Sequence, residues 1–148
     1  MLKLILNKKY NPLFSSDARY FIITGGRGSG KSFAVTVFLT LLTMTKGIRI
    51  LFTRYTMTSA HLSIIPEFLE KIGLLGFDEV FNINKAEVVN TSNQSDILFR
   101  GIRTSAGNQT ASLKSLQGIS TWVLDEAEEL VDENIFDTID LSIREKNI

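Results

Sequence analysis

The sequence predicts an α/β fold with a mostly parallel sheet flanked by helices, and three observations support this prediction. An apolar run at residues 20–23 leads into a glycine-rich loop, and an apolar helical segment follows at 33–42. Two further apolar runs, at 48–53 and 121–124, have the nearly continuous hydrophobic content of strands that are covered on both faces. Strand, helix and strand at this spacing favour a right-handed βαβ unit, in which the strands lie in one parallel sheet.

Composition limits the classes of function. The 148 residues, 44% of them hydrophobic, suffice for one globular domain with a substantial core. Sixteen basic and sixteen acidic residues cancel, so any contact with DNA has to come from a local patch of charge. Cysteine is absent, which excludes disulfides and thiolate metal sites and is typical of a cytosolic protein. No apolar run is long enough to span a membrane, and the first nine residues lack the pattern of a secretory signal.

The loop at residues 25–32 has the P-loop pattern: a glycine, four residues, and then glycine, lysine and serine. Its glycines allow backbone N–H groups to turn inward and surround the phosphates of a nucleotide. Lys31 would place its ammonium group on the outer two phosphates, and Ser32 would place its hydroxyl on Mg²⁺. The alternative is a glycine-rich turn that only joins a strand to a helix. The predicted nucleotide-binding residues are Gly25, Gly26, Arg27, Gly28, Ser29, Gly30, Lys31 and Ser32.

The other elements follow from local patterns. Residues 2–6 have the composition of a short strand, and a loop bent by Pro12 follows. Apolar residues at intervals of three and four predict a helix over 58–72, which Pro66 must kink or divide. The runs 86–90 and 96–100 predict an antiparallel hairpin at a sheet edge, and 133–144 have the apolar spacing of a helix.

Tyr10 and Phe14 precede the P-loop in the sequence. The segment just ahead of a phosphate loop often lies near the base of the nucleotide, so both rings are candidates to pack against adenine. An equally good interpretation is that they cover the edge of the core.

Two acids follow the apolar run at 121–124, and they complete the predicted site. At the carboxyl end of a buried parallel strand, Asp125 would lie near the metal and Glu126 near the attacking water, at the edge where open α/β sheets bind ligands. Acids at this position also favour the start of a helix, so the pair alone is weak evidence. Together with Lys31 and Ser32 it predicts nucleotide hydrolysis.

Three stretches together resemble the N-terminal ATPase domain of the large terminase of tailed bacteriophages, the motor that packages viral DNA. They are 25–32, with an arginine inside the P-loop, then 113–118, and then 122–130, which contains the run Asp-Glu-Ala-Glu-Glu. The resemblance spans most of the chain. It implies a P-loop, RecA-like fold, ATP and Mg²⁺ as cofactors, and an enzyme that hydrolyses ATP.

The resemblance also implies roles for individual residues. Arg27 would reach the terminal phosphate, Asp125 would support Mg²⁺, and Glu126 would activate water, so the implied catalytic residues are Glu126, Arg27 and Lys31, and the implied metal ligands are Ser32 and Asp125. Such motors usually hydrolyse ATP when a neighbouring subunit inserts a cation into the site. Lys114, with Arg100 and Arg103, lies in the right region of the sequence to supply this cation. The alternative interpretation is that each of them is an ordinary charged residue exposed to solvent.

The partners implied by the resemblance are double-stranded DNA, the small terminase, the portal protein and further copies of the chain, in the cytoplasm of the bacterial host and without a membrane. RecA-like ATPases place a further strand between the Asp-Glu strand and the P-loop strand, and this sequence does not supply it. We therefore expect residues 1–148 to form an ATPase domain that is truncated on its C-terminal side, an incomplete RecA-like core with the nuclease domain absent. A RecA-like DNA helicase and a regulatory module that only binds nucleotide are the alternatives.

Overall fold

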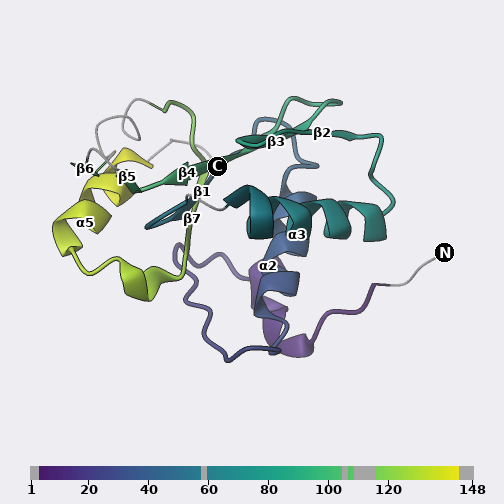
Figure 1. Cartoon of the computed structure of the whole chain (residues 1–148). Coiled ribbons are helices and arrows are strands. Elements are labelled where there is room, and N and C mark those ends of the chain that lie inside the picture. Colours follow the sequence, from purple (N-terminus) through teal and green to yellow (C-terminus); the bar gives the residue numbers. More distant parts are fainter. Residues whose placement is uncertain (1–3, 58–59, 105–106, 109–115, 144–148) are drawn as a thin grey trace.

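The computed structural model describes residues 4–57, 60–104, 107–108 and 116–143, which form a sheet covered by helices on both faces (Figure 1). The five-stranded sheet has the order β2-β3-β4-β1-β7. Its strands are β1 (Arg49–Arg54), β2 (Phe81–Ile83), β3 (Glu87–Asn90), β4 (Asp96–Gly101) and β7 (Thr121–Asp125). Two short strands, β5 (Arg103–Thr104) and β6 (Gly107–Asn108), pair separately. The helices are η1 (Lys8–Tyr10), α1 (Pro12–Ser15), α2 (Lys31–Leu42), α3 (Ala60–Leu74), η2 (Ala127–Glu129) and α5 (Glu133–Ser142).

Strand β1 is the centre of the parallel part of the sheet. It pairs in parallel with β4 on one side and with β7 on the other. Its residues alternate between two cores: Ile50 and Phe52 face α2 and α3, whereas Leu51 faces the layer that contains α5. Figure 1 shows α2 and α3 on one side of the sheet and α5 on the other. The predicted α/β class is therefore confirmed, in a form compatible with a partial RecA-like core.

The larger core contains a cluster of three phenylalanines. The rings of Phe52, Phe68 and Phe99 have centroids 5.3 to 6.0 Å apart and meet edge to face or at a tilt. These are the arrangements that aromatic quadrupoles favour. The cluster joins α3 to β1 and β4 and thereby fixes the helix on the sheet.

Helix α3 continues through Pro66 as a single element, so no new helix begins there. The predicted hairpin is confirmed, because β3 and β4 pair antiparallel. The sheet nevertheless ends one strand further out, at β2, which pairs antiparallel with β3. Strand β2 was not predicted, because three residues are too few to show a strand period in the sequence.

Two predicted strands are wrong. Residues 4–6 are irregular, and so are residues 20–23, which lie outside the sheet ahead of the P-loop. Ile22 is 90% exposed, and the hydroxyl of Tyr20 donates to Asp140 on α5. The segment is thus held by a side-chain contact and not by pairing with a neighbouring strand. An apolar run becomes a strand only where a neighbour satisfies its backbone groups. Among the described residues, no strand pairs with the outer edge of β7, where the family resemblance would place such a neighbour.

Candidate functional site

The loop before α2 has the backbone of a tight, glycine-dependent turn. Gly28 and Gly30 lie in the left-handed region, with φ of 80° and 78°, where a side chain would be strained. At Gly25 a Cβ atom would lie 2.8 Å from the Oγ atom of Ser29. That hydroxyl is buried and has no hydrogen-bond partner among the described residues. The loop therefore needs glycine at positions 25, 28 and 30, and among the described residues it contains an unpaired polar atom.

The N-terminus of α2 is not capped by any side chain, and its first turn contains no acidic residue. Helix α5 differs, because the side chain of Asp132 accepts from the backbone N–H of Asn134 there. The first N–H groups of a helix have no partner within the helix, and the helix dipole makes that end positive. A glycine-rich loop that leads into an uncapped helix is the usual geometry of an anion site.

The charged side chains of the loop lie at the surface of this helix end. The ammonium group of Lys31 donates to the carbonyl oxygen of Gly25 at 3.0 Å, so it lies across the mouth of the loop. Arg27 and Ser32 are exposed. All three polar groups are thus accessible to a ligand at the N-terminus of α2.

The acid pair lies where the sequence predicted it, at the carboxyl end of β7. Asp125 is the last residue of the strand and pairs in register with Arg54, the last residue of β1. The Nε and Nη2 atoms of Arg54 donate to Oδ2 of Asp125 at 3.1 and 2.5 Å. Glu126 has a left-handed backbone, with φ of 51°, and begins the turn η2.

Another carboxylate lies on the same turn. A side-chain hydrogen bond with Glu126 is the main cause that raises the pKa of Glu129, with burial and the repulsion of the Glu126 charge as the next causes. The charge of Arg54 opposes this rise. Three acids and one arginine therefore interact at the carboxyl ends of β1 and β7.

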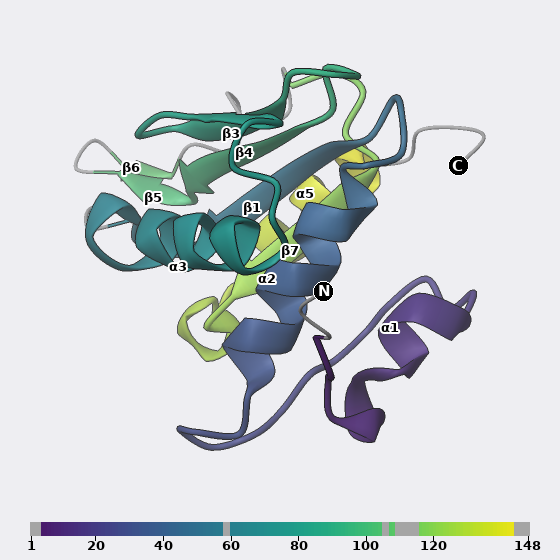
Figure 2. The same ribbon diagram turned by 90° about the vertical axis from the view of Figure 1, so that its right-hand side faces the viewer.

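The P-loop and the acid pair lie at the same end of the molecule. Figure 2 shows the N-terminal end of α2, in blue, on the side to which the yellow-green loop after β7 extends. In the same view α2 runs back toward the start of β1, which follows it in the chain, and β7 is parallel to β1. The edge formed by strand ends and a helix start is where open α/β sheets bind ligands.

The N-terminal segment contacts both the loop and α2. Tyr10 is 6% exposed, and its hydroxyl donates to the carbonyl oxygen of Ser29 at 3.0 Å. Phe14 packs edge to face on Phe38 of α2, with ring centroids 5.2 Å apart. Tyr10 thus contacts the glycine-rich loop, and Phe14 contacts α2.

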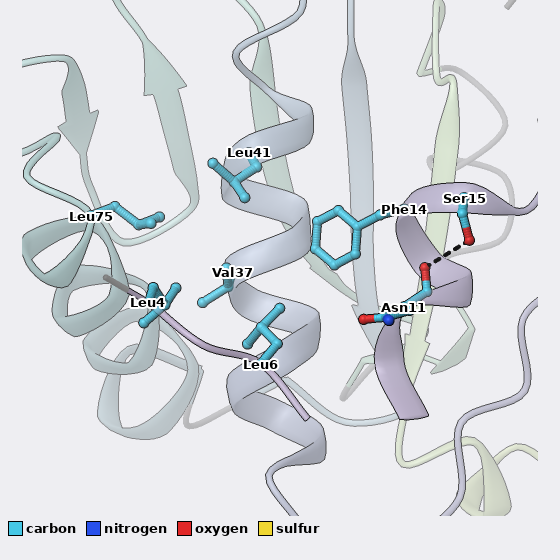
Figure 3. Close-up of a pocket in the computed structure, with 8 residues that line it drawn as sticks. All are labelled: Leu4, Leu6, Asn11, Phe14, Ser15, Val37, Leu41 and Leu75. Atoms are coloured by element: carbon cyan, nitrogen blue, oxygen red, sulfur yellow. Dashed lines mark hydrogen bonds between the residues drawn. The ribbon is translucent and has the colours of Figure 1, made fainter. Parts of the chain in front are cut away.

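Two open grooves border this segment. One of about 540 Å³ lies between residues 4–15 and α2, and Figure 3 shows Phe14 pointing toward Val37 and Leu41 there. A smaller one, of about 300 Å³, lies between residues 9–13 and the lead-in at 21–24. Both have mainly apolar walls.

Comparison with known protein families decides the assignment. A profile described as phage terminase large subunit matches residues 17–148, a range that contains the P-loop, the acid pair and all five strands of the main sheet. The chain belongs to the phage terminase large subunit family. A search of curated proteins found no significant match.

The candidate cations of this terminase chain have different positions. Lys114 lies outside the described residues. Arg100, on β4, donates to the carbonyl oxygens of Phe99 and Ala86, at 2.8 and 3.4 Å, and Arg103 is exposed on β5. In the described part of the terminase chain, no helix is long and apolar enough to cross a membrane.

Two residues of the candidate site were not predicted from the sequence. Arg54 ends a buried strand, and the register of β1 with β7 brings it to Asp125. The sequence shows that a charged residue, Arg54, ends the apolar run at 48–53, but only the pairing register of β1 with β7 identifies Asp125 as its partner. Glu129 lies three residues after Glu126, and the sharp turn η2 brings the two acids onto the same turn.

Proposed function

We propose that this chain binds ATP with Mg²⁺ and hydrolyses it as the motor part of a viral DNA-packaging machine. The observation that carries the proposal is the placement of an uncapped, glycine-led helix start and an acid pair at one end of the same sheet. Membership of the terminase large subunit family supports the packaging role.

The phosphates of ATP would bind at the N-terminus of α2. Gly25, Gly26, Gly28, Ser29 and Gly30 would surround them with backbone N–H groups, and the helix dipole adds positive potential. The ammonium group of Lys31 would exchange its carbonyl partner for phosphate oxygens, which are stronger acceptors because they are charged. Arg27, exposed on the loop, would contact the terminal phosphate.

The donor groups at this edge fit Mg²⁺. Ser32 offers a hydroxyl and Asp125 a carboxylate, and hard oxygen ligands are those that Mg²⁺ prefers. Among the described residues, no group of three or more histidines, cysteines or acids could form a protein cage for a metal. This pattern suits Mg²⁺, which usually takes one or two protein ligands beside phosphates and water. When bound, the ion would neutralise charge on the phosphates.

The hydrolytic step would use Glu126 as the base. It would accept a proton from water as the water oxygen forms a bond to the terminal phosphorus, and the bond from phosphorus to the bridging oxygen breaks, leaving ADP and phosphate. The guanidinium of Arg27 would stabilise the charge on the phosphoryl oxygens. A cation from a neighbouring copy, with Lys114 as the first candidate, would complete the site.

The packaging role implies partners. We propose that the hydrolysis drives translocation of double-stranded DNA in the host cytoplasm, in a ring of copies that contacts the small terminase and the portal protein. Because the basic and acidic residues are equal in number, DNA contact requires a local basic patch.

The test compares variants at three positions. Lys31→Ala should weaken ATP binding, because the ammonium group on the outer phosphates is lost. Glu126→Gln should keep binding and lower ATP turnover by about 10²–10⁴-fold, because the base is lost. Glu128→Gln, the same chemical change two residues along, is the control and should retain turnover. Binding is measured by titration calorimetry and turnover by phosphate release, both in the packaging-competent protein.

The results also separate the alternatives. Turnover in Glu126→Gln equal to that of the wild type would contradict the assignment of the base. Binding without turnover in the wild type would favour a regulatory nucleotide-binding module. ATP-dependent strand separation on a forked duplex would favour a helicase.

A further inference from the structure

Strand β1 has an arginine at each end, and each arginine forms an ion pair with an aspartate on a neighbouring strand. Arg49 is the first residue and pairs in register with Asp96 of β4. Arg54 is the last residue and pairs in register with Asp125 of β7. The two pairs are alike in chemistry but lie at opposite ends of the strand, and only the second lies at the proposed catalytic edge.

The pair at the catalytic edge is asymmetric. Arg54 donates twice, from Nε and Nη2, and both bonds go to Oδ2 of Asp125. Oδ1 accepts no hydrogen bond from the described residues, and the Asp125 side chain is 33% exposed. One carboxylate oxygen is therefore fixed, and the other is open to solvent.

The same guanidinium reaches the neighbouring acid. Its Nε atom lies 3.8 Å from Oε2 of Glu126. The Arg54 side chain is only 20% exposed, so its charge is less screened than that of a surface arginine. A single cation thus lies between the acid proposed for the metal and the acid proposed for the water.

Arg54 is held on a rigid support. Its carbonyl oxygen accepts from the backbone N–H of Ile102 at 3.1 Å. The preceding Thr53 donates to the carbonyl oxygen of Val123 and accepts from the indole N–H of Trp122. The hydrogen bonds therefore tie the ends of β1 and β7 together immediately before the ion pair.

We propose that Arg54 is a positioning residue that orients Asp125 for the metal by binding one of its carboxylate oxygens and leaving the other to the metal and its water. The inference rests on the proposed function, since it assigns a role within the same ATP site. Groups that hydrogen-bond a metal-binding side chain fix its orientation, and their loss typically lowers metal affinity or activity by about 10–100-fold. The metal requirement of ATP binding should therefore depend on Arg54.

The test titrates Mg²⁺ against binding of a fluorescent, non-hydrolysable ATP analogue. Trp122 is the only tryptophan and lies three residues before Asp125, so energy transfer from it reports binding at this edge. In Arg54→Gln the Mg²⁺ concentration at half-maximal binding should rise about tenfold or more, as expected for a lost outer contact to a metal ligand. Binding in EDTA should match the wild type, because the P-loop alone provides it. Arg54→Lys keeps the charge but offers one donor nitrogen in place of two, so its midpoint should lie between those of the wild type and Arg54→Gln.

Arg49→Gln is the matched control, because it removes the equivalent pair at the other end of β1 and should leave the Mg²⁺ midpoint unchanged. A midpoint in both Arg54 variants equal to the wild type would overturn the inference and reduce the pair to a structural contact. A lower midpoint in Arg54→Gln would also overturn it, since Arg54 would then compete with the metal. If the wild type itself binds no nucleotide at any Mg²⁺ concentration, the proposed function fails, which is a separate result.

Discussion

Glu126 and Glu129 are two carboxylates on one short turn, and the proximity of Glu126 raises the pKa of Glu129. The raised pKa of Glu129 means that the folded state takes up this proton at a higher pH than the unfolded chain. The resulting contribution to stability is fully present below the ordinary carboxyl pKa and is lost as the pH rises through the raised value. When protonated, Glu129 would donate this proton in a hydrogen bond to the carboxylate of Glu126, the proposed base.

We therefore expect ATP turnover to fall as the pH drops through the raised pKa of Glu129. In Glu129→Gln this titration is absent, and the acidic limb of the pH–rate profile should move to lower pH. Glu133→Gln, which changes an exposed acid at the start of α5, is the control. An acidic limb that stays in place in Glu129→Gln would show that the pair does not govern the profile.

Single residues differed in how well the sequence predicted them. The P-loop and the acid pair are local patterns, and the structure places both at the same edge of the sheet. Arg54 could not be assigned, because its contact with Asp125 depends on the register of two strands that are about seventy residues apart in the sequence. Lys114 lies outside the described residues, so its role stays a prediction.

Among the elements, the N-terminal segment depends most on tertiary contacts. The elements with long apolar stretches, α2, α3, β1 and β7, form close to their predicted ranges. Helices α2 and α3 and strand β1 contribute buried residues to the core, whereas β7 is half-buried at the edge of the sheet. The segment 7–15 instead forms η1 and α1 and contacts the loop through Tyr10 and α2 through Phe14. Its contacts suggest that it supports the conformation of the P-loop.

We expect Tyr10→Phe to weaken ATP binding by about two- to tenfold, because the lost hydrogen bond to Ser29 is worth about 0.5–1.5 kcal/mol and the buried ring is kept. Tyr20→Phe is the control, since its hydroxyl contacts Asp140 on α5 and not the loop. Binding is measured by calorimetry. Equal affinities in the two variants would show that the hydroxyl of Tyr10 does not support the loop.

At the scale of the whole molecule, stability depends on the aromatic cluster under α3. Phe68 is 1% exposed and contacts Phe52 and Phe99, whereas the next residue, Leu69, is 50% exposed. We expect Phe68→Ala to lower the free energy of unfolding by about 3–5 kcal/mol, through lost burial and the cavity that remains. Leu69→Ala should cost about 1 kcal/mol or less. Urea unfolding measures both, and similar losses would contradict the assignment of the core.

The sequence by itself determined the fold class, the antiparallel hairpin and the local patterns of the candidate site, because each depends on residues that are close together in the chain. The tertiary structure decided three other features. Residues 20–23 are not a strand, β2 extends the sheet, and Arg54 joins the acid pair. Strand formation and cross-strand contacts require a neighbour, and the identity of that neighbour is set by how distant segments come together.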